Sequence, residues 1–389
     1  MLRALDVADF RLLWAGRLVS DLGSYLLIVA IPFHVHQLTG SATATGLTLA
    51  VESLPAVLVG PMAGVRVDRW NRRRIMIAAD LLRAGAILLI LFADRPERVW
   101  WVYLALLAES LGTVFFRPAA RAMTPDVVGL GPDLVAANSL NALSTGTVRL
   151  VGPPLGAALL VWSGLPALIL LDAASYLVSA LAITAITTRT TTTGDGSAKP
   201  LRDGLAFTAG HPVLRGLLVL NTAFFTANAV FTALLVPFVS QRFTDSPGAV
   251  GYLVSALGAG YLLGAPVAGL LVRRLTPSRL MLLGQTGVGL CFAAMVNAPT
   301  LVVAIAAAGI AGVPGSVLMT TIDTTVQRGA PSALRGRVGA AFHVSDAVAA
   351  LLGASAAAVL GAHHPITSVL TWSAVAILCT AAAGLLILP

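Results

Sequence analysis

Charged side chains are scarce in this sequence. Only 11% of its 389 residues are Asp, Glu, Lys or Arg, whereas 57% are hydrophobic, and the mean hydropathy is +0.88. A soluble chain normally carries about 25% charged residues, because polar side chains must cover its surface. The composition therefore excludes a soluble protein and indicates a membrane protein whose apolar exterior is solvated by lipid.

Cysteine and the motifs of cofactor chemistry are also nearly absent. The two cysteines, Cys291 and Cys379, lie in apolar stretches without metal-site or redox spacing, so we expect no metal and no cofactor. No phosphate-binding loop of the type G-x-x-x-x-G-K followed by Ser or Thr occurs, which argues against an ATP-driven pump in one chain. The loops are too short for a catalytic cluster, and we expect no enzyme activity.

Positive charge is concentrated in short arginine clusters, and the net charge is +8. In a soluble protein this excess would suggest nucleic-acid binding. Here the clusters lie between apolar stretches without an aromatic-interleaved basic face, so no nucleic-acid partner is expected. The densest cluster, "GVRVDRWNRRR", occupies residues 64–74.

Apolar stretches long enough to cross a bilayer recur along the whole chain, since a spanning helix needs about 20 mostly apolar residues. They predict an all-α integral membrane protein with twelve transmembrane helices. The approximate ranges are 12–38, 45–66, 74–93, 99–122, 136–161, 165–187, 213–240, 248–272, 278–297, 300–326, 335–361 and 366–388.

The chain divides into two similar halves. A Thr- and Gly-rich stretch over 187–204 reads as a flexible linker. We therefore predict a six-helix bundle over 1–187, a cytoplasmic linker over 188–211 and a second six-helix bundle over 212–389. Adding 205 to first-half numbers aligns Gly46 with Gly251 and Pro61 with Pro266. Parallel six-helix repeats are typical of one class of transporters, in which the substrate cavity lies between the halves.

The arginine clusters also predict orientation, because cytoplasmic loops of membrane proteins carry an excess of Lys and Arg. Arginine-rich and arginine-poor loops alternate along the chain. Both termini are therefore expected in the cytoplasm, in a multi-pass protein of the plasma (inner) membrane. The arginine-rich segments are the N-terminus, the loop over 66–74, the linker, and the loops near 273–279 and 328–337.

The stretch over 64–74 resembles motif A of the major facilitator superfamily. In that superfamily the motif is a cytoplasmic gate, a latch that stabilises the outward-open state. The resemblance implies a gate role here, and the alternative is that the cluster only fixes topology. The matching positions are Gly64, Asp68, Arg69, Arg72 and Arg73.

A second stretch, "GTVRLVGPPLGA", resembles motif C of the drug:proton antiporters. Gly146 opens the stretch, Gly152, Pro153 and Gly156 match, and Ala157 replaces the second glycine of the closing pair. The resemblance implies antiport, and plain helix packing is the alternative. The phrases "FRLLWAGRLVSDLG", "RAMTPDVV" and "LLDAASYLVSAL" resemble the macrolide- and enterobactin-exporter branch.

Ionisable residues inside the apolar stretches are candidate coupling groups, because such residues are costly and usually face a cavity. Glu109, Asp21 and Glu52 are the proton-carrier candidates, and Arg149 is the cation that could hold a partner carboxylate charged. The alternative is buried pairs that set helix packing. Weaker candidates are Asp172 and Asp346. Asp80 and Arg83 are expected to snorkel or pair near a cytoplasmic end.

Aromatic residues make up only 6% of the chain. Phe115, Phe224, Phe231 and Tyr252 are candidates to line an apolar substrate cavity. Aromatic residues at helical spacing are more often ordinary packing residues, so that alternative stays open.

Together these features predict a secondary transporter that exports amphiphilic small molecules in exchange for protons by alternating access. Its expected partners are the substrate, protons and membrane lipids, and a monomer is expected. The alternatives are a facilitated uniporter or importer, sodium coupling, a polytopic enzyme, and a receptor or scaffold that lost transport. The sequence does not name the substrate.

Overall fold

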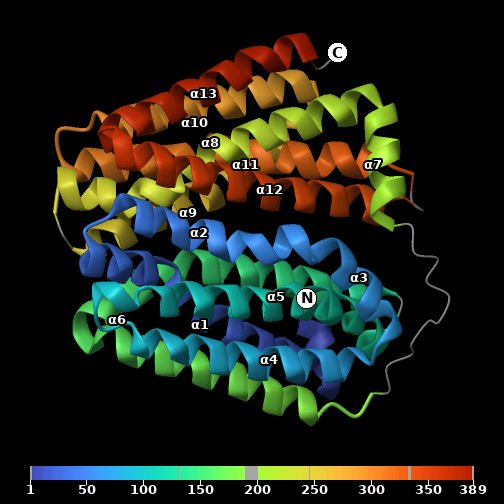
Figure 1. Cartoon of the computed structure of the whole chain (residues 1–389). Helices are drawn as coiled ribbons and strands as arrows, with labels where there is room; N and C mark the ends of the chain where they lie inside the picture. The colour runs from blue at the N-terminus through green and yellow to red at the C-terminus, as the bar shows by residue number, and fades with distance from the viewer. Residues whose placement is uncertain (1, 130, 189–199, 245, 332–333, 388–389) are drawn as a thin grey trace. The chain divides into compact units, whose positions relative to one another are not determined.

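The structure is a computed structural model that describes residues 2–129, 131–188, 200–244, 246–331 and 334–387 (Figure 1). Within these ranges all regular secondary structure is helical. The first helices are α1 (Ala8–Thr39), α2 (Ala42–Leu58), α3 (Gly60–Arg69), α4 (Arg72–Leu88), α5 (Trp100–Val128) and α6 (Pro132–Thr184). The later helices are α7 (Pro200–Gly210), α8 (Pro212–Arg242), α9 (Pro247–Leu271), α10 (Pro277–Val296), α11 (Leu301–Gly329), α12 (Arg335–His363) and α13 (Ile366–Ile387). Short 3-10 helices are η1 (Leu2–Asp6), η2 (Leu89–Phe92) and η3 (Pro96–Arg98).

Among the described residues, ten helices are long and apolar enough to cross a membrane. One of them, α6, contains 53 residues and is interrupted at Gly164, whose φ of 75° and ψ of 168° are not helical. Such a backbone favours glycine, because other residues have a Cβ that clashes there. Dividing α6 at this point and counting the shorter apolar helix α2 with its continuation α3 gives the twelve predicted spans.

Local sequence signals fix where several helices begin. The helices α8, α9 and α10 each start at a proline, namely Pro212, Pro247 and Pro277. Proline suits the first helical position because its fixed φ is helical and its missing N–H has no partner there anyway. Asn71 caps α4 by accepting a hydrogen bond of 3.0 Å from the backbone N–H of Arg74.

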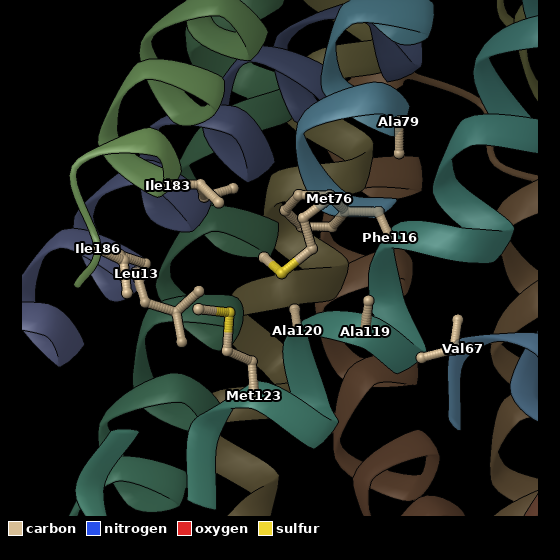
Figure 2. Close-up of a cluster of buried hydrophobic side chains, with 10 residues drawn as sticks. All are labelled: Leu13, Val67, Met76, Ala79, Phe116, Ala119, Ala120, Met123, Ile183 and Ile186. Atoms are coloured by element: carbon tan, nitrogen blue, oxygen red, sulfur yellow. The ribbon is translucent and has the colours of Figure 1, made fainter. Parts of the chain in front are cut away.

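The first compact unit comprises Met1–Thr39 and Leu54–Ala198. In it α1 packs on α6, and α4 packs on both α5 and α6. Part of its core is a cluster of ten buried hydrophobic side chains from α1, α3, α4, α5, the end of α6 and the segment just after it, drawn in Figure 2. This packing holds the polar side chains of the next subsection at fixed positions.

The second compact unit comprises Gly40–Ser53 and Lys199–Pro389. Here α11 packs on α9 and α10, and α8 packs on α12 and α13. Its first segment differs from the predicted division, because the beginning of α2 groups with the second unit. The reason is close contact with α12: the Thr43 hydroxyl donates a hydrogen bond of 2.9 Å to the Ala358 carbonyl, and Gly46 lies against the same residue.

The stretch predicted as a linker contains a helix that the sequence analysis missed. Residues 189–199 lie outside the described residues, but α7 follows directly and packs on α12. Thr208 is buried, and Asp203 forms an ion pair of 3.0 Å with Arg337 of α12. Gly204 lies against the Arg337 backbone, where a Cβ would overlap the carbonyl oxygen.

Candidate functional site

A buried ion pair on α4 lies at the centre of the first unit's polar site. Asp80 and Arg83 are one helical turn apart and form a salt bridge. Their exposed fractions are 0% and 4%. Of the two expectations for these residues, pairing is therefore confirmed, and snorkelling toward the membrane surface is wrong. Snorkelling is blocked because the pair is enclosed by α5 and α6.

Two aromatic rings enclose the guanidinium of Arg83. Its central carbon lies 4.2 Å from the ring centre of Phe116 on α5 and 4.4 Å from that of Tyr176 on α6. Both distances are within cation–π range, and such contacts gain strength when they are desolvated. Gly112 leaves the space for this arrangement, because a Cβ there would lie 2.7 Å from Cγ of Arg83.

The Tyr176 hydroxyl connects this pair to Glu109. It donates a hydrogen bond of 3.0 Å to Oε1 of Glu109, which also accepts one of 2.9 Å from the Thr113 hydroxyl. Ser24 of α1 places its Oγ 2.9 Å from the same Tyr176 hydroxyl. Hydrogen bonds from α1, α5 and α6 thus connect Ser24, Tyr176 and Glu109, one of the three proton-carrier candidates of the sequence analysis.

A third carboxylate, Asp172, lies one turn before Tyr176 on α6 and is 1% exposed. The Ser175 hydroxyl lies 3.3 Å from its Oδ1. Gly23 of α1 makes room for it, because a Cβ at that position would collide with the Asp172 carboxylate. Asp172 is within Coulombic range of both Glu109 and Arg83.

We call Asp80, Arg83, Glu109, Asp172 and Tyr176 the Arg83 cluster. It contains three carboxyl groups and one guanidinium, so full ionisation would leave two net negative charges in the interior of the unit. Uncompensated buried charge is very costly, and proteins usually neutralise it by protonation. The arrangement is therefore chemically suited to holding protons.

The other predicted coupling residues make their direct contacts outside the Arg83 cluster, although Asp21 is within Coulombic range of Asp80. Asp21 forms an ion pair of 3.6 Å with Arg17 on α1 and is about one third exposed. Arg149 is exposed, and its Nε donates a hydrogen bond of 2.9 Å to the Tyr25 hydroxyl. Glu52 is exposed on the part of α2 that belongs to the second unit. The structure thus brings Glu109 together with Asp80 and Asp172 rather than with Arg149.

The motif A arginines at the start of α4 connect it to two other helix ends. Nη1 of Arg72 lies 2.5 Å from a carboxylate oxygen of Asp126 near the end of α5. Arg73 donates hydrogen bonds to the Ile183 and Thr184 carbonyls at the end of α6, where helix carbonyls lack partners. Arg69 is exposed at the end of α3. Gly64 and Asp68 are not among the residues whose side-chain surroundings the structure describes, so the roles predicted for them stay predictions.

The motif C glycines pack α6 against α1. A Cβ on Gly152 would lie 2.5 Å from Cβ of Tyr25, and one on Gly156 would overlap the Leu26 carbonyl. Gly146 has no neighbour within 4 Å of its missing Cβ. Pro153 is buried, and the helical backbone continues through it; the break comes later, at Gly164. The antiport role inferred from this motif stays a prediction.

The predicted cavity aromatics have different surroundings. Phe224 and Phe231 are buried in the second unit, and Phe231 stacks on Phe292 with ring centres 4.0 Å apart. Phe115 packs against the core cluster of the first unit. Tyr252 is 62% exposed on α9. Their assignment to a substrate cavity stays a prediction.

Sequence reasoning missed several polar residues. It did not single out Tyr176, although its spacing of four from Asp172 places both on one helix face. In the second unit it missed Asn221, which is buried and donates a hydrogen bond of 2.7 Å to Asp346. No local signal could have found that pair, since its members are 125 positions apart.

Comparison with known proteins gives two similar curated relatives. Macrolide efflux protein A of Streptococcus pyogenes is 30% identical over 270 residues, which cover 67% of this chain and 66% of that protein, just under two thirds. Enterobactin exporter EntS of Escherichia coli O1:K1 is 26% identical over 358 residues, or 91% of this chain and 85% of that protein.

Solved structures show the same fold at low sequence identity. The nucleoside transporter NupG superposes with a TM-score of 0.78 at 12% identity, covering 97% of this chain and 100% of that one. A bacterial homologue of the iron transporter ferroportin, in an inward-facing state, gives 0.76 at 16% identity, covering 98% and 97%. These likenesses confirm the predicted all-α major facilitator fold.

The family described as transmembrane secretion effector matches residues 2–388, nearly the whole chain. The matched family and the solved structures are secretion and transport proteins rather than enzymes, in agreement with the sequence prediction. The chain therefore belongs to the transmembrane secretion effector family of the major facilitator superfamily.

Proposed function

We propose that this protein is a secondary active exporter that moves amphiphilic small molecules out of the cell in exchange for protons by alternating access. The names of the relatives, a macrolide efflux protein and an enterobactin exporter, support export. The observation that carries proton exchange is the excess of carboxyl groups in the Arg83 cluster.

The proton is bound at the Arg83 cluster and is shared among its carboxyl groups. Arg83 compensates one negative charge, and Asp80 is its direct partner. A second or third ionised carboxylate would need its own cation, and the described contacts of the cluster supply none. Glu109 and Asp172 are therefore the groups that take up and release protons.

Coupling follows from the position of Glu109. It is half-buried, whereas Asp172 and Asp80 are almost fully buried. Glu109 is thus the member that exchanges protons with water, and Tyr176 relays its charge state to Arg83. Antiport then requires that substrate binding and protonation favour opposite states of the transporter.

The test uses purified protein in liposomes that contain a pH-sensitive dye, under an imposed proton gradient. Macrolides, cationic dyes and siderophores are added in turn, and internal pH is followed. We expect substrate-evoked proton movement that Glu109→Gln lowers at least about 10-fold, roughly 1.4 kcal/mol of coupling, with Asp172→Asn close behind. The matched control Glu97→Gln, an exposed carboxylate on η3, leaves the signal unchanged.

Three results would redirect the assignment. Substrate flux without proton movement would overturn antiport and favour a facilitated uniporter. Proton movement that survives both cluster variants would move the proton site to Asp21 or Glu52. Replacing the proton gradient by a sodium gradient without loss of export would indicate sodium coupling.

The remaining features of the proposal concern placement and gating. We place both termini in the cytoplasm, because the arginine-rich loops alternate with arginine-poor ones, and we propose that the protein is a monomer in the plasma membrane. The motif A residues form a cytoplasmic gate, and motif C favours antiport. The partners are the exported small molecule, protons and the surrounding lipid.

A further inference from the structure

Two arginines on α5 continue the polar stripe that begins at Glu109. Glu109, Thr113, Arg117 and Arg121 follow one another at intervals of four, so each lies beside the next in a stripe that winds slowly around the helix. Both arginines are exposed, whereas the next residues of α5 that enter the core, Ala119 and Ala120, are almost fully buried. The stripe thus runs from a carboxylate to two guanidinium groups.

A third arginine, Arg17 of α1, joins them. Arg121 lies within Coulombic range of both Arg17 and Arg117, and α1 packs on α5. Arg17 is bound by Asp21, with a separation of 3.6 Å. We call Arg17, Arg117 and Arg121 the arginine stripe.

The arginine stripe lies close to one end of the predicted spans 12–38 and 99–122. At about 1.5 Å per residue, Arg117 and Arg121 are about 8 and 2 Å inside the end of the second span, and Arg17 is about 8 Å inside the start of the first. Long arginine side chains near a span end extend toward water rather than lipid. The exposed side chains of Arg117 and Arg121 are therefore expected to be open to a ligand from the aqueous side.

The stripe has an excess of positive charge, unlike the buried or half-buried arginines that are paired elsewhere in the described chain. Arg72, Arg83 and Arg337 each have a carboxylate partner. In the part of the chain that the structure describes, no hydrogen bond or ion pair reaches Arg117 or Arg121. Three like charges with only Asp21 bound to them repel one another, and an anionic ligand would remove that repulsion.

We propose that the arginine stripe binds the anionic group, a carboxylate or phosphate, of an amphiphilic substrate. The inference rests on the proposed export function and adds the substrate's charge to it. Guanidinium groups hold planar oxyanions by two parallel hydrogen bonds, which favours arginine at such sites. Arg117 and Arg121 follow Glu109 on the same helix, so the bound anion would lie about two to three helical turns along α5 from the proton-exchanging carboxylate.

The test is equilibrium binding by fluorescence to the full-length protein in nanodiscs, without any proton gradient. The probes are a dansyl-labelled long-chain carboxylate and its primary amide, which differ only in charge. In phosphatidylcholine nanodiscs we expect the carboxylate to bind about 10-fold more tightly than the amide. Arg117→Gln and Arg121→Gln should remove that difference and leave amide binding unchanged, which also shows that each variant is folded. The control Arg98→Gln, in an exposed pair with Asp94, should bind like the wild type.

Nanodiscs that also contain phosphatidylglycerol separate a small-molecule anion from a lipid headgroup. Persistence of the tenfold difference supports a site for the soluble anion, whereas its loss would mean that lipid phosphate occupies the stripe and would overturn the proposal. Equal binding of carboxylate and amide to the wild type would also overturn it. This binding test measures no proton flux, so it remains interpretable even if the liposome experiment shows no antiport. If antiport is found but the protein does not prefer the carboxylate probe, only the anion-binding inference is overturned.

Discussion

The Tyr176 hydroxyl donates a hydrogen bond of 3.0 Å to Glu109. The ring of the same tyrosine covers Arg83 at 4.4 Å, so one side chain from α6 contacts both the Glu109 carboxylate of α5 and the buried cation of α4. Because Tyr176 contacts both groups, a change in the charge of Glu109 alters the electrostatic environment of Arg83 through this one side chain. This relationship makes Tyr176 the sharpest test of the cluster.

Tyr176→Phe removes the hydroxyl and keeps the ring over Arg83. We expect proton-coupled transport to fall about 10-fold, because a hydrogen bond to a charged group is worth about 1.5–3 kcal/mol. The measurement is substrate-evoked proton flux in liposomes. In a double-mutant cycle with Glu109→Gln the two effects should not add, because Tyr176→Phe removes the bond to the carboxylate and Glu109→Gln removes the charge that this bond senses. Additive losses would contradict the proposed connection.

Arg83→Met should strongly destabilise the fold, because it leaves buried carboxylates without their cation. Breaking a buried ion pair from one side typically costs about 3–5 kcal/mol. The double variant Asp80→Asn with Arg83→Met removes both charges and should recover part of that loss. Thermal unfolding in detergent measures both. A double variant that is less stable than Arg83→Met alone would show that the pair is not the source of the effect.

The motif C glycines allow a matched comparison on one helix. Gly156→Ala places a methyl group against the Leu26 carbonyl of α1 and should cost about 1–3 kcal/mol through overpacking. Gly146→Ala has open space around its Cβ and should be neutral or stabilising by up to about 1 kcal/mol, since alanine favours helix. The measurement is the free energy of unfolding of each variant, obtained from its unfolding curve. Equal stability would rule out close α1–α6 packing at Gly156.

The Arg72–Asp126 ion pair should connect the beginning of α4 to the end of α5. Arg72 is 8% exposed, and Nη1 also donates to the Ala122 carbonyl at 3.3 Å. Arg72→Ala and Asp126→Ala should each lower stability by about 1.5–3 kcal/mol, and the double variant by less than the sum. Arg74→Ala, whose side chain is exposed, is the control and should change stability by less than about 0.5 kcal/mol.

Much of the fold could be predicted from local properties. The twelve apolar stretches match the helices, including the two that meet at Gly164. The helix α7 was missed because its sequence has little apolar periodicity, and its stability comes from contacts such as Asp203 with Arg337. The beginning of α2 was assigned to the first half, because nothing in its own sequence reveals its packing on Ala358.

The site was predictable only in part. Glu109 was one of three candidates chosen for their place in apolar stretches, and the structure places it in a polar cluster. Asp172 was ranked low and Asp80 was expected near the surface, yet both are almost fully buried. Arg149, the expected cation partner, bonds to Tyr25 instead.

The sequence by itself determined that this is a membrane protein with twelve apolar stretches long enough to span a bilayer, because span length, hydropathy and charge distribution are properties of consecutive residues. Only the tertiary structure decided which ionisable groups meet. Tyr176 and Glu109 are 67 positions apart, and their contact depends on how α1, α4, α5 and α6 pack. Glycines such as Gly23 and Gly112 set that packing by leaving space for Asp172 and Arg83, and their effect is visible only once the neighbouring helix is in place.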